Sequence, residues 1–333
     1  MKKILLPFIY SAIGFIATAQ PATPADVKDL KQREDSLKKF GYDMVNAKDA
    51  GQRFRADSLF TKSLVRALKV KNSFEFPFDS LQSISRLYAP DNTFRIFTWQ
   101  VEKDESVNRQ HGAIQMKTTD GSLKLFPLID RSDIINSPFD TTMNNFWWIG
   151  NIYYRMILKE ANGKKYYTLI GYDEYTMKVT RKWIDVLSFN EKGEPVFGEP
   201  IFSFKEDSIP KQNQNRFSLE FKKDGRARVQ YDDDMDMILY DHLISETDEP
   251  QKKYTLIPDG DYEGFKWQNG QWVHVNKVFT FKLKDGEAPV PEPLDMDNRQ
   301  KIEDILNGRK KQEEKNVTPV KPKPGKPKPK RKG

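Results

Sequence analysis

The stretch "FWWIGNIYYRMILKEANGKKYYTLIGY" (residues 146–172) decides the fold class of this chain. Two runs rich in aromatic and β-branched residues flank the pair Asn162-Gly163. Both residues of an Asn-Gly pair tolerate positive φ, so the pair favours the two-residue turn of a β-hairpin. The stretch therefore predicts two antiparallel strands joined by a tight turn.

The same kind of signal recurs along the chain. Further turns between β-rich runs are predicted at Asp120-Gly121, Lys192-Gly193, Asp224-Gly225 and Asn269-Gly270. Sequential hairpins with few helical patterns between them predict an antiparallel β-meander of about twelve strands, not a parallel α/β sheet. So many strands either close into a barrel or split into a sandwich, and a small propeller is a further alternative.

A helical hairpin is predicted ahead of the strands. Thr23 suits an N-cap, Pro24 the first helical position, and Asp26 the acidic position of a capping box. Apolar residues then recur at helical spacing over residues 27–44 and again over residues 54–68. The fold class is therefore α+β, with the helices first and the strands after them.

The N-terminus reads as a targeting segment. Lys2 and Lys3 precede an apolar run over residues 4–16, and Ala17-Thr18-Ala19 has the small-x-small form of a cleavage site. The run is shorter than the roughly 20 residues that a membrane-spanning helix needs. We expect cleavage after Ala19, no transmembrane segment in the mature chain, and export to the periplasm, the extracellular space or the cell surface. An uncleaved membrane anchor is the alternative.

The chain contains no cysteine. This excludes disulfides, thiolate metal sites and thiol nucleophiles, so the hydrophobic core must stabilise the fold alone. The sequence also contains no phosphate-binding loop, no G-x-S-x-G, no H-E-x-x-H and no dinucleotide fingerprint. These absences exclude the enzyme classes that depend on those motifs.

The charge of the chain is unevenly distributed. The formal net charge is +7, but residues 309–333 carry eleven basic and two acidic residues, and residues 20–308 have a net charge of -4. Alternating Lys and Pro cannot pack into a core, so the tail is predicted to be extended and disordered. It either contacts anionic envelope components or serves as a solubilising end. Nucleic acid is not an expected partner, because the chain is exported and carries no motif that reads bases.

The predicted organisation has five regions, with one more short helix expected over residues 79–88. They are a signal peptide (1–19), a helical hairpin (20–75), an antiparallel β domain (90–285), a linker with a short helix (286–308) and a Lys/Pro-rich tail (309–333).

One hairpin carries a candidate ligand-binding face. If Asn269-Gly270 forms a two-residue turn, Trp267 faces Trp272 and Phe265 faces His274 across the strands. The side-chain period of two places all four on one face of the sheet. Such a face either stacks on a sugar ring or a peptide, or packs into the core.

Two acidic groups are candidate metal sites. Asp259, Asp261 and Glu263 alternate as the first carboxylates of a Ca²⁺ loop do, although no glutamate follows at the twelfth position. A turn at the Pro-Asp-Gly sequence explains Asp259 without a metal. The run of aspartates at residues 232–236 either supplies Ca²⁺ ligands or forms a turn between two strands. No other cofactor is expected.

The neighbours Asp241 and His242 resemble a catalytic pair only in the linear sequence. Successive side chains of a strand point to opposite faces, so the two cannot form a dyad, and His242 needs a more distant acid. Asp236, Asp241 and Glu263 are the candidate carboxylates for hydrolysis, which requires two acids to converge in a pocket and one of them to have a raised pKa.

Three stretches together resemble an uncharacterised family of secreted proteins from Gram-negative bacteria of the Bacteroidota type. They are "YYTLIGYDEYTMKVTRKWIDVLSFNEKGEPVFGEPIF" (166–202), "MILYDHL" (237–243) and "LIPDGDYEGFKWQNGQWV" (256–273). The resemblance covers the β-rich part, about residues 94–279, and implies that these stretches belong to one folded unit. It implies no activity, cofactor or catalytic residue.

These observations predict an exported, non-enzymatic envelope or surface protein that binds or scaffolds. A secreted glycan or peptide hydrolase that uses carboxylates of the β domain is the alternative.

Overall fold

The computed structural model describes residues 22–104 and 107–279. Contacts divide the chain into two units, and the first contains the described residues up to Lys277, with all of the helices and strands. The predictions for the signal peptide (1–19), the linker (286–308) and the tail (309–333) fall outside the described residues. Among the helices that are described, none has the length and apolarity that a membrane crossing requires.

The predicted helical hairpin is confirmed. It consists of α1 (Pro24–Asn46) and α2 (Ala50–Leu68). The capping box forms as expected, because Asp26 N donates to Thr23 Oγ1 at 3.2 Å and Thr23 N donates to an Asp26 carboxylate oxygen at 3.2 Å. A 3₁₀ turn, η1 (Ser73–Glu75), follows the second helix.

The prediction of a short helix over residues 79–88 is wrong. The segment turns and then enters β1 (Ser85–Tyr88), which pairs antiparallel with β2 (Phe94–Asp104). Pairing with the long neighbouring strand satisfies the backbone groups of the segment, and this outweighs its local helical spacing. β1 thus becomes the edge of the first sheet.

The first sheet has four strands in the order β1-β2-β3-β4, each antiparallel to the next. Its last two strands are β3 (Val107–Met116) and β4 (Lys124–Ile129). The predicted turn at Asp120-Gly121 lies between them.

The second sheet has six strands and contains the hairpin of residues 146–172. Its path runs β5-β9-β8-β7-β6, and β11 pairs with the free part of β8. The strands are β5 (Met143–Asn144), β6 (Ile152–Ala161), β7 (Lys164–Asp173), β8 (Val179–Phe189), β9 (Pro195–Phe197) and β11 (Phe217–Lys222).

The third sheet has five strands in the order β10-β15-β14-β13-β12, and only the short β10–β15 pair is parallel. A second 3₁₀ turn, η2 (Lys253–Thr255), precedes β14. The strands are β10 (Phe202–Ser203), β12 (Val229–Asp232), β13 (Met237–Ser245), β14 (Leu256–Gln268) and β15 (Gln271–Val275).

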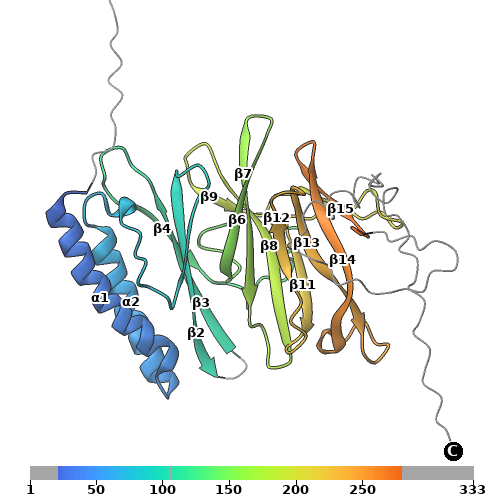
Figure 1. Cartoon of the computed structure of the whole chain (residues 1–333), viewed down its shortest axis with the longest axis horizontal. Coiled ribbons are helices and arrows are strands. Elements are labelled where there is room, and N and C mark those ends of the chain that lie inside the picture. Colours follow the sequence, from blue (N-terminus) through green and yellow to red (C-terminus); the bar gives the residue numbers. More distant parts are fainter. Residues whose placement is uncertain (1–21, 105–106, 280–333) are drawn as a thin grey trace, which may run out of the picture. The chain divides into compact units, whose positions relative to one another are not determined.

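The helical hairpin and the three sheets stack as four layers (Figure 1). Three buried clusters fill the spaces between them, one between the helices and the first sheet, one between the first and second sheets, and one between the second and third. None of the sheets closes on itself, so the barrel alternative is wrong. Stacked open sheets bury the strands face against face instead.

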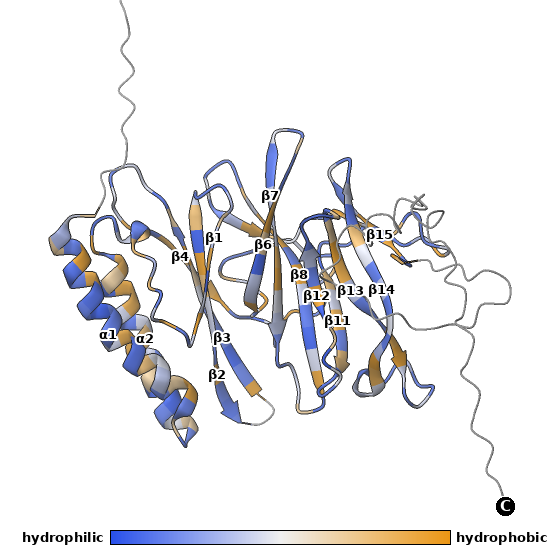
Figure 2. Ribbon diagram, viewed as in Figure 1, coloured by the Kyte–Doolittle hydropathy of each residue, from blue (hydrophilic) through white to orange (hydrophobic). Residues whose placement is uncertain are grey.

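The middle sheet is apolar on both faces, as its position requires. In β7, Leu169 points into the cluster shared with the first sheet and its neighbour Ile170 into the cluster shared with the third. Trp183 and Ile184 of β8 divide in the same way. Figure 2 shows β7 changing from hydrophilic at its hairpin end to hydrophobic within the stack. Continuous apolar runs of this kind belong to strands covered on both sides.

The turn predictions hold for most hairpins. Asn162 and Gly163 have φ of 51° and 73° between β6 and β7, and Asn269 and Gly270 have φ of 49° and 80° between β14 and β15. These are the positive values that a type I′ turn needs.

The prediction of a hairpin at Asp224-Gly225 is wrong. β11, on one side of this turn, pairs with β8 in the second sheet, whereas β12, on the other side, pairs with β13 in the third. The chain therefore passes between layers here. Local turn residues specify that the chain reverses, but they do not specify which strand the next segment joins.

Candidate functional site

The predicted aromatic face exists with the expected register, but it faces the core. Phe265 pairs with His274 and Trp267 with Trp272, as anticipated. Phe265 and Trp272 have no exposed surface, and Trp272 Nε1 donates to Thr168 Oγ1 in the second sheet at 2.9 Å. Side chains that fill the space between two sheets cannot stack on a ligand in solution. The core-packing alternative therefore describes Phe265 and Trp272.

His274 lies at the end of this core, where three polar groups surround it. Its Nδ1 lies 2.7 Å from Asp207 Oδ1, and its Nε2 lies 2.7 Å from Tyr240 OH and 3.2 Å from Glu263 Oε2. An imidazole with a carboxylate at each nitrogen is best satisfied when both nitrogens carry a proton. The two carboxylates thus bond a protonated ring from both sides. Through His274, they connect the loop after β10, which carries Asp207, to β14 and β15.

The pKa values in this network follow from the same contacts. Burial alone would lower the pKa of His274, but the hydrogen bonds that the ring donates to Glu263 and Asp207 outweigh it and raise the pKa above its usual value. Burial opposes a low pKa at Glu263, yet its bonds to His274 and Tyr240 hold the pKa below the usual range. Both shifts favour the charged forms, a protonated His274 and an ionised Glu263.

This network predicts a pH-dependent contribution to stability. A base with a raised folded-state pKa stabilises fully below its unfolded pKa of about 6.5, and this contribution is lost as the pH rises through the folded value. We expect the wild-type unfolding free energy to decrease, relative to that of His274→Gln, as the pH rises above about 6.5. Denaturant titrations across this range measure it.

His242→Gln is the comparison variant, because His242 is more exposed than His274 and its nearest carboxylate is Asp259, at 2.8 Å, with Glu263 farther away at 3.7 Å. Parallel pH profiles for the wild type and His274→Gln would contradict the assignment of the charge to His274. The titratable side chains that bond the His274 ring are those of Asp207, Glu263 and Tyr240.

The three carboxylates proposed as a Ca²⁺ loop lie in strand β14, where His242 Nδ1 lies 2.8 Å from Asp259 and His242 Nε2 lies 3.7 Å from Glu263. Asp259 holds His242, Asp261 pairs with Lys277 at 3.2 Å, and Glu263 belongs to the His274 network. Within the described residues, no group of three or more His, Cys, Asp or Glu is arranged to hold a metal ion. An extended strand, in place of a loop, keeps these side chains from folding around one point.

The run of aspartates at residues 232–236 forms the expected turn between β12 and β13. The turn is fastened to β6 of the second sheet, because Lys159 bonds Asp236 and Arg155 bonds Asp233. Tyr231 also donates to Asp236. These aspartates therefore link two layers through charged and polar contacts.

The carboxylates proposed for hydrolysis only partly come together. Asp241 and Glu263 line a hollow of about 240 Å³ with His242 and His274, whereas Asp236 lies in the turn described above. Asp241 is buried and accepts a hydrogen bond from Arg228 N at 2.7 Å, so it orders the backbone. Glu263 has a lowered pKa, the opposite of what a general acid needs.

The carboxyl groups whose pKa is raised lie elsewhere, in buried ion pairs. Burial raises the pKa of Asp173 and Asp185, and Arg181 and Arg216 beside them oppose the shift only in part. Neither carboxyl lines the hollow around His274. The geometry that a carboxylate hydrolase requires is therefore not assembled by the predicted residues.

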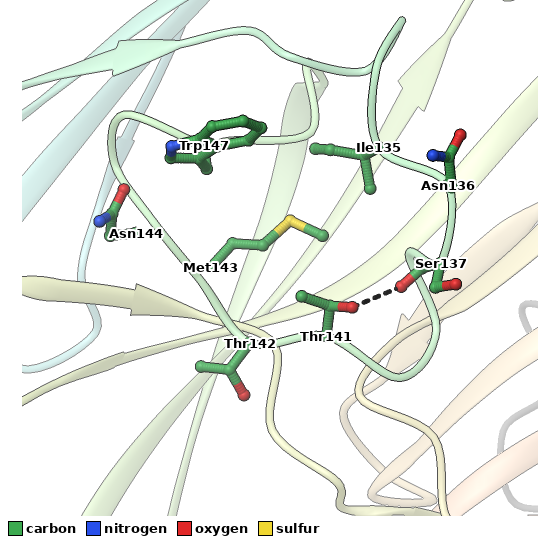
Figure 3. Close-up of a pocket in the computed structure, with 8 residues that line it drawn as sticks. All are labelled: Ile135, Asn136, Ser137, Thr141, Thr142, Met143, Asn144 and Trp147. Carbon is green, nitrogen blue, oxygen red and sulfur yellow. Dashed lines mark hydrogen bonds between the residues drawn. The ribbon is translucent and has the colours of Figure 1, made fainter.

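A second hollow, the loop pocket, is formed by the chain between β4 and β6 and has a volume of about 400 Å³ (Figure 3). Figure 3 shows the apolar side chains of Ile135, Met143 and Trp147 pointing toward one another, with hydroxyl and amide side chains around them. None of the lining residues is charged. They are Ile135, Asn136, Ser137, Thr141, Thr142, Met143, Asn144 and Trp147.

Asn144 and Trp148 determine how Trp147 is presented. Asn144 Oδ1 accepts from Phe146 N at 2.9 Å and Asn144 O accepts from Trp147 N at 3.0 Å, which forms a tight turn. Trp148 is fully buried and its Nε1 donates to Tyr153 OH at 2.8 Å. With its neighbour anchored in the core, Trp147 points outward and remains 50% exposed.

A buried ion pair holds the opposite wall of the loop pocket. Arg216 has no exposed surface, and its Nε donates to Asp185 Oδ1 at 3.1 Å. Its Nη1 donates to the carbonyl oxygens of Pro138 and Thr141, the latter at 2.9 Å. The pocket wall is thereby fastened to the middle sheet, which is covered on both faces.

The pocket was not predicted from the sequence. The doublet Trp147-Trp148 was visible, but residue order alone does not indicate which indole is buried. The available signal was the density of Asn, Ser and Thr around the doublet, which is unusual for a segment that lies in a core.

A third hollow, of about 580 Å³, lies on the helical hairpin and has a different character. Its lining includes Lys39, Asp43, Lys48 and Arg55 beside the apolar Leu59. Charged side chains of this kind are commonly found on the solvated face of a helix. The loop pocket is therefore the better candidate for a ligand site.

Comparison of the chain with known protein families, with curated proteins and with solved structures gives no match. The resemblance to a secreted family of the Bacteroidota type stays a prediction.

Proposed function

We propose that this chain is an exported, non-enzymatic binding protein of the bacterial envelope or surface, and that the loop pocket is its ligand site. The observation that carries the proposal is the half-exposed indole of Trp147 at a concave, uncharged site. Exposed tryptophan in a hollow is a common anchor for binding, because a large rigid ring buries much area at little entropic cost.

The rigidity of the pocket wall supports the same role. A site that is ordered before the ligand arrives loses less conformational entropy on binding. Arg216 and Asp185 order one wall from within the core, and Asn144 orders the turn that carries Trp147. These contacts position side chains without supplying an acid, a base or a nucleophile.

The sequence supports the location of this role. The targeting segment at residues 1–19 predicts export, and the basic tail at residues 309–333 suits an anionic envelope. The hydrolase alternative receives less support, because Asp236, Asp241 and Glu263 are engaged in separate structural contacts.

The proposal predicts that Trp147→Ala weakens binding to envelope material. Full-length mature protein is mixed with envelopes from a Gram-negative bacterium, and the bound fraction is measured by sedimentation. We expect the apparent affinity to fall about tenfold or more, as for loss of an aromatic anchor. The protein should remain folded, because the side chain is half exposed.

Phe146→Ala is the matched control, since Phe146 is 57% exposed on the same loop but does not line the pocket. Deletion of residues 318–333 separates the contribution of the tail, which should be sensitive to salt. Equal binding by the wild type, Trp147→Ala and Phe146→Ala would overturn the assignment of the site to the loop pocket.

A further inference from the structure

We propose that the loop pocket selects a neutral saccharide, with one sugar ring lying against the indole of Trp147. This inference rests on the proposed function and adds the chemical class of the ligand. It follows from three properties of the pocket: an open aromatic face, unused hydrogen-bonding groups around it, and a lining without charge.

The first property is the combination of Trp147 with an apolar floor. Ile135 and Met143 lie beside the indole in Figure 3, and Met143 is buried. The face of an aromatic ring is electron-rich. It attracts the polarised C–H bonds on the apolar face of a pyranose ring, and the floor excludes water from this contact. A purely polar metabolite would gain nothing from such a floor.

The second property is the supply of unpaired amide and hydroxyl groups. Among the described residues, no side chain or backbone group bonds the side chains of Asn136 and Ser137, and the side-chain N–H groups of Asn144 have no acceptor. All three residues are exposed. Amides and hydroxyls both donate and accept, which matches the dual character of sugar hydroxyls.

The hydroxyl groups of Thr141 and Thr142 form hydrogen bonds within the protein. Thr141 Oγ1 donates to Ser137 O at 2.8 Å, and Thr142 Oγ1 accepts from Asn215 Nδ2 at 3.1 Å. These bonds fix the shape of the loop. The pocket thus has a set of ordering contacts and a separate set of groups available to a ligand.

The third property is the absence of charge among the eight lining residues. A site for an anionic sugar, a phosphate or a carboxylate would gain most from an Arg or Lys positioned to pair with it. Here an ionised ligand would lose hydration without such a partner. The lining therefore discriminates in favour of neutral sugars.

A peptide is the main competing ligand, because β5 is an edge strand that could pair with an added strand. β5 contains only Met143 and Asn144, so it offers a very short ladder. Peptide recognition by strand addition draws its affinity from main-chain hydrogen bonds along an exposed edge. The short edge and the exposed indole favour a saccharide.

The test is a binding panel with full-length mature protein, measured by calorimetry and by tryptophan fluorescence. The probes are short neutral oligomers of β-glucan, α-glucan, mannan and chitin, an oligogalacturonate as the anionic sugar, and a library of extended peptides. We expect at least one neutral oligomer to bind, Trp147→Ala to lose about tenfold or more in affinity, and Phe146→Ala to match the wild type.

The outcomes separate this inference from the proposed function. Binding of peptides or of oligogalacturonate, but of no neutral oligomer, with the same dependence on Trp147 would overturn the saccharide class and leave the binding role intact. Neutral oligomers that bind equally to the wild type and to Trp147→Ala would overturn this site. No binding in the panel, together with envelope binding that is indifferent to Trp147→Ala, would overturn both proposals.

Discussion

Replacing Arg216 with methionine is expected to lower the free energy of unfolding by about 3–5 kcal/mol. The substitution leaves the carboxylate of Asp185 buried without its cation and removes the donor to the carbonyl oxygens of Pro138 and Thr141. Removing one partner of a buried ion pair destabilises a protein by much more than the intact pair stabilises it. Urea denaturation measures the loss.

Two further results identify the cause of this loss. The loss should shrink at low pH, because burial already raises the pKa of Asp185 and a protonated carboxyl no longer needs a cation. The double variant Asp185→Leu/Arg216→Met should be more stable than Arg216→Met, since it removes both buried charges.

Arg33→Met is the surface control for Arg216. Arg33 pairs with Asp29 at 2.9 Å on the exposed side of α1, and such pairs contribute about 0.5 kcal/mol or less. A loss of stability in Arg216→Met no larger than that in Arg33→Met would contradict the role assigned to the buried pair.

Loss of ligand binding in Arg216→Met is also expected, since the pocket wall loses its support.

Arg95→Ala is expected to have an effect of similar size, about 3–5 kcal/mol, from unsatisfied acceptors and a cavity in the core. Arg95 is fully buried, and no carboxylate in the described part of the chain bonds it. Its guanidinium donates to the carbonyl oxygens of Ser73 and Phe76, to Gln115 Oε1 and to Tyr88 OH, at 2.6–2.8 Å.

Aromatic rings replace the missing anion around Arg95. The guanidinium carbon lies 4.9–5.5 Å from the ring centroids of Phe74, Phe78, Tyr88 and Phe97. Burial nevertheless lowers the pKa of Arg95 to about 10, so the group remains charged at neutral pH. Cation–π contacts and a fork of hydrogen bonds together hold this charge inside the protein.

Arg95→Lys separates the contribution of the guanidinium hydrogen bonds from that of the positive charge. A single ammonium cannot reach all four acceptors, so we expect this variant to lose about 2 kcal/mol or more. Arg109→Ala on the adjacent strand β3 is the control, because the Arg109 side chain is 42% exposed and pairs with Asp133 at 3.2 Å. Wild-type stability in Arg95→Lys would show that charge alone suffices.

Local signals explain why part of the architecture could be predicted. The capping box at Thr23 and Asp26 and the Asn-Gly turns at residues 162–163 and 269–270 each depend on residues close in sequence. Helical spacing and strand alternation then assign the elements between them. The α+β class and the register of Trp267 against Trp272 followed from these signals.

The candidate site could not be predicted in the same way. Phe265 and Trp147 are both aromatic residues near a hairpin, yet Phe265 is fully buried and Trp147 is half exposed. The difference depends on how the layers stack, which covers one residue and not the other. Likewise, Asp207 and His274 are 67 residues apart and meet only because the loop after β10 returns to the end of the core.

The sequence by itself determined the two N-terminal helices and the Asn-Gly hairpins, since capping, turn formation and side-chain periodicity act between near neighbours. Only the tertiary structure decided that the sheets stack open, that β11 joins β8, and that the uncharged site lies beside Trp147. The physical reason is that packing joins distant segments. Arg216 meets Asp185 from 31 residues away and Pro138 from 78, and that convergence places the wall of the pocket.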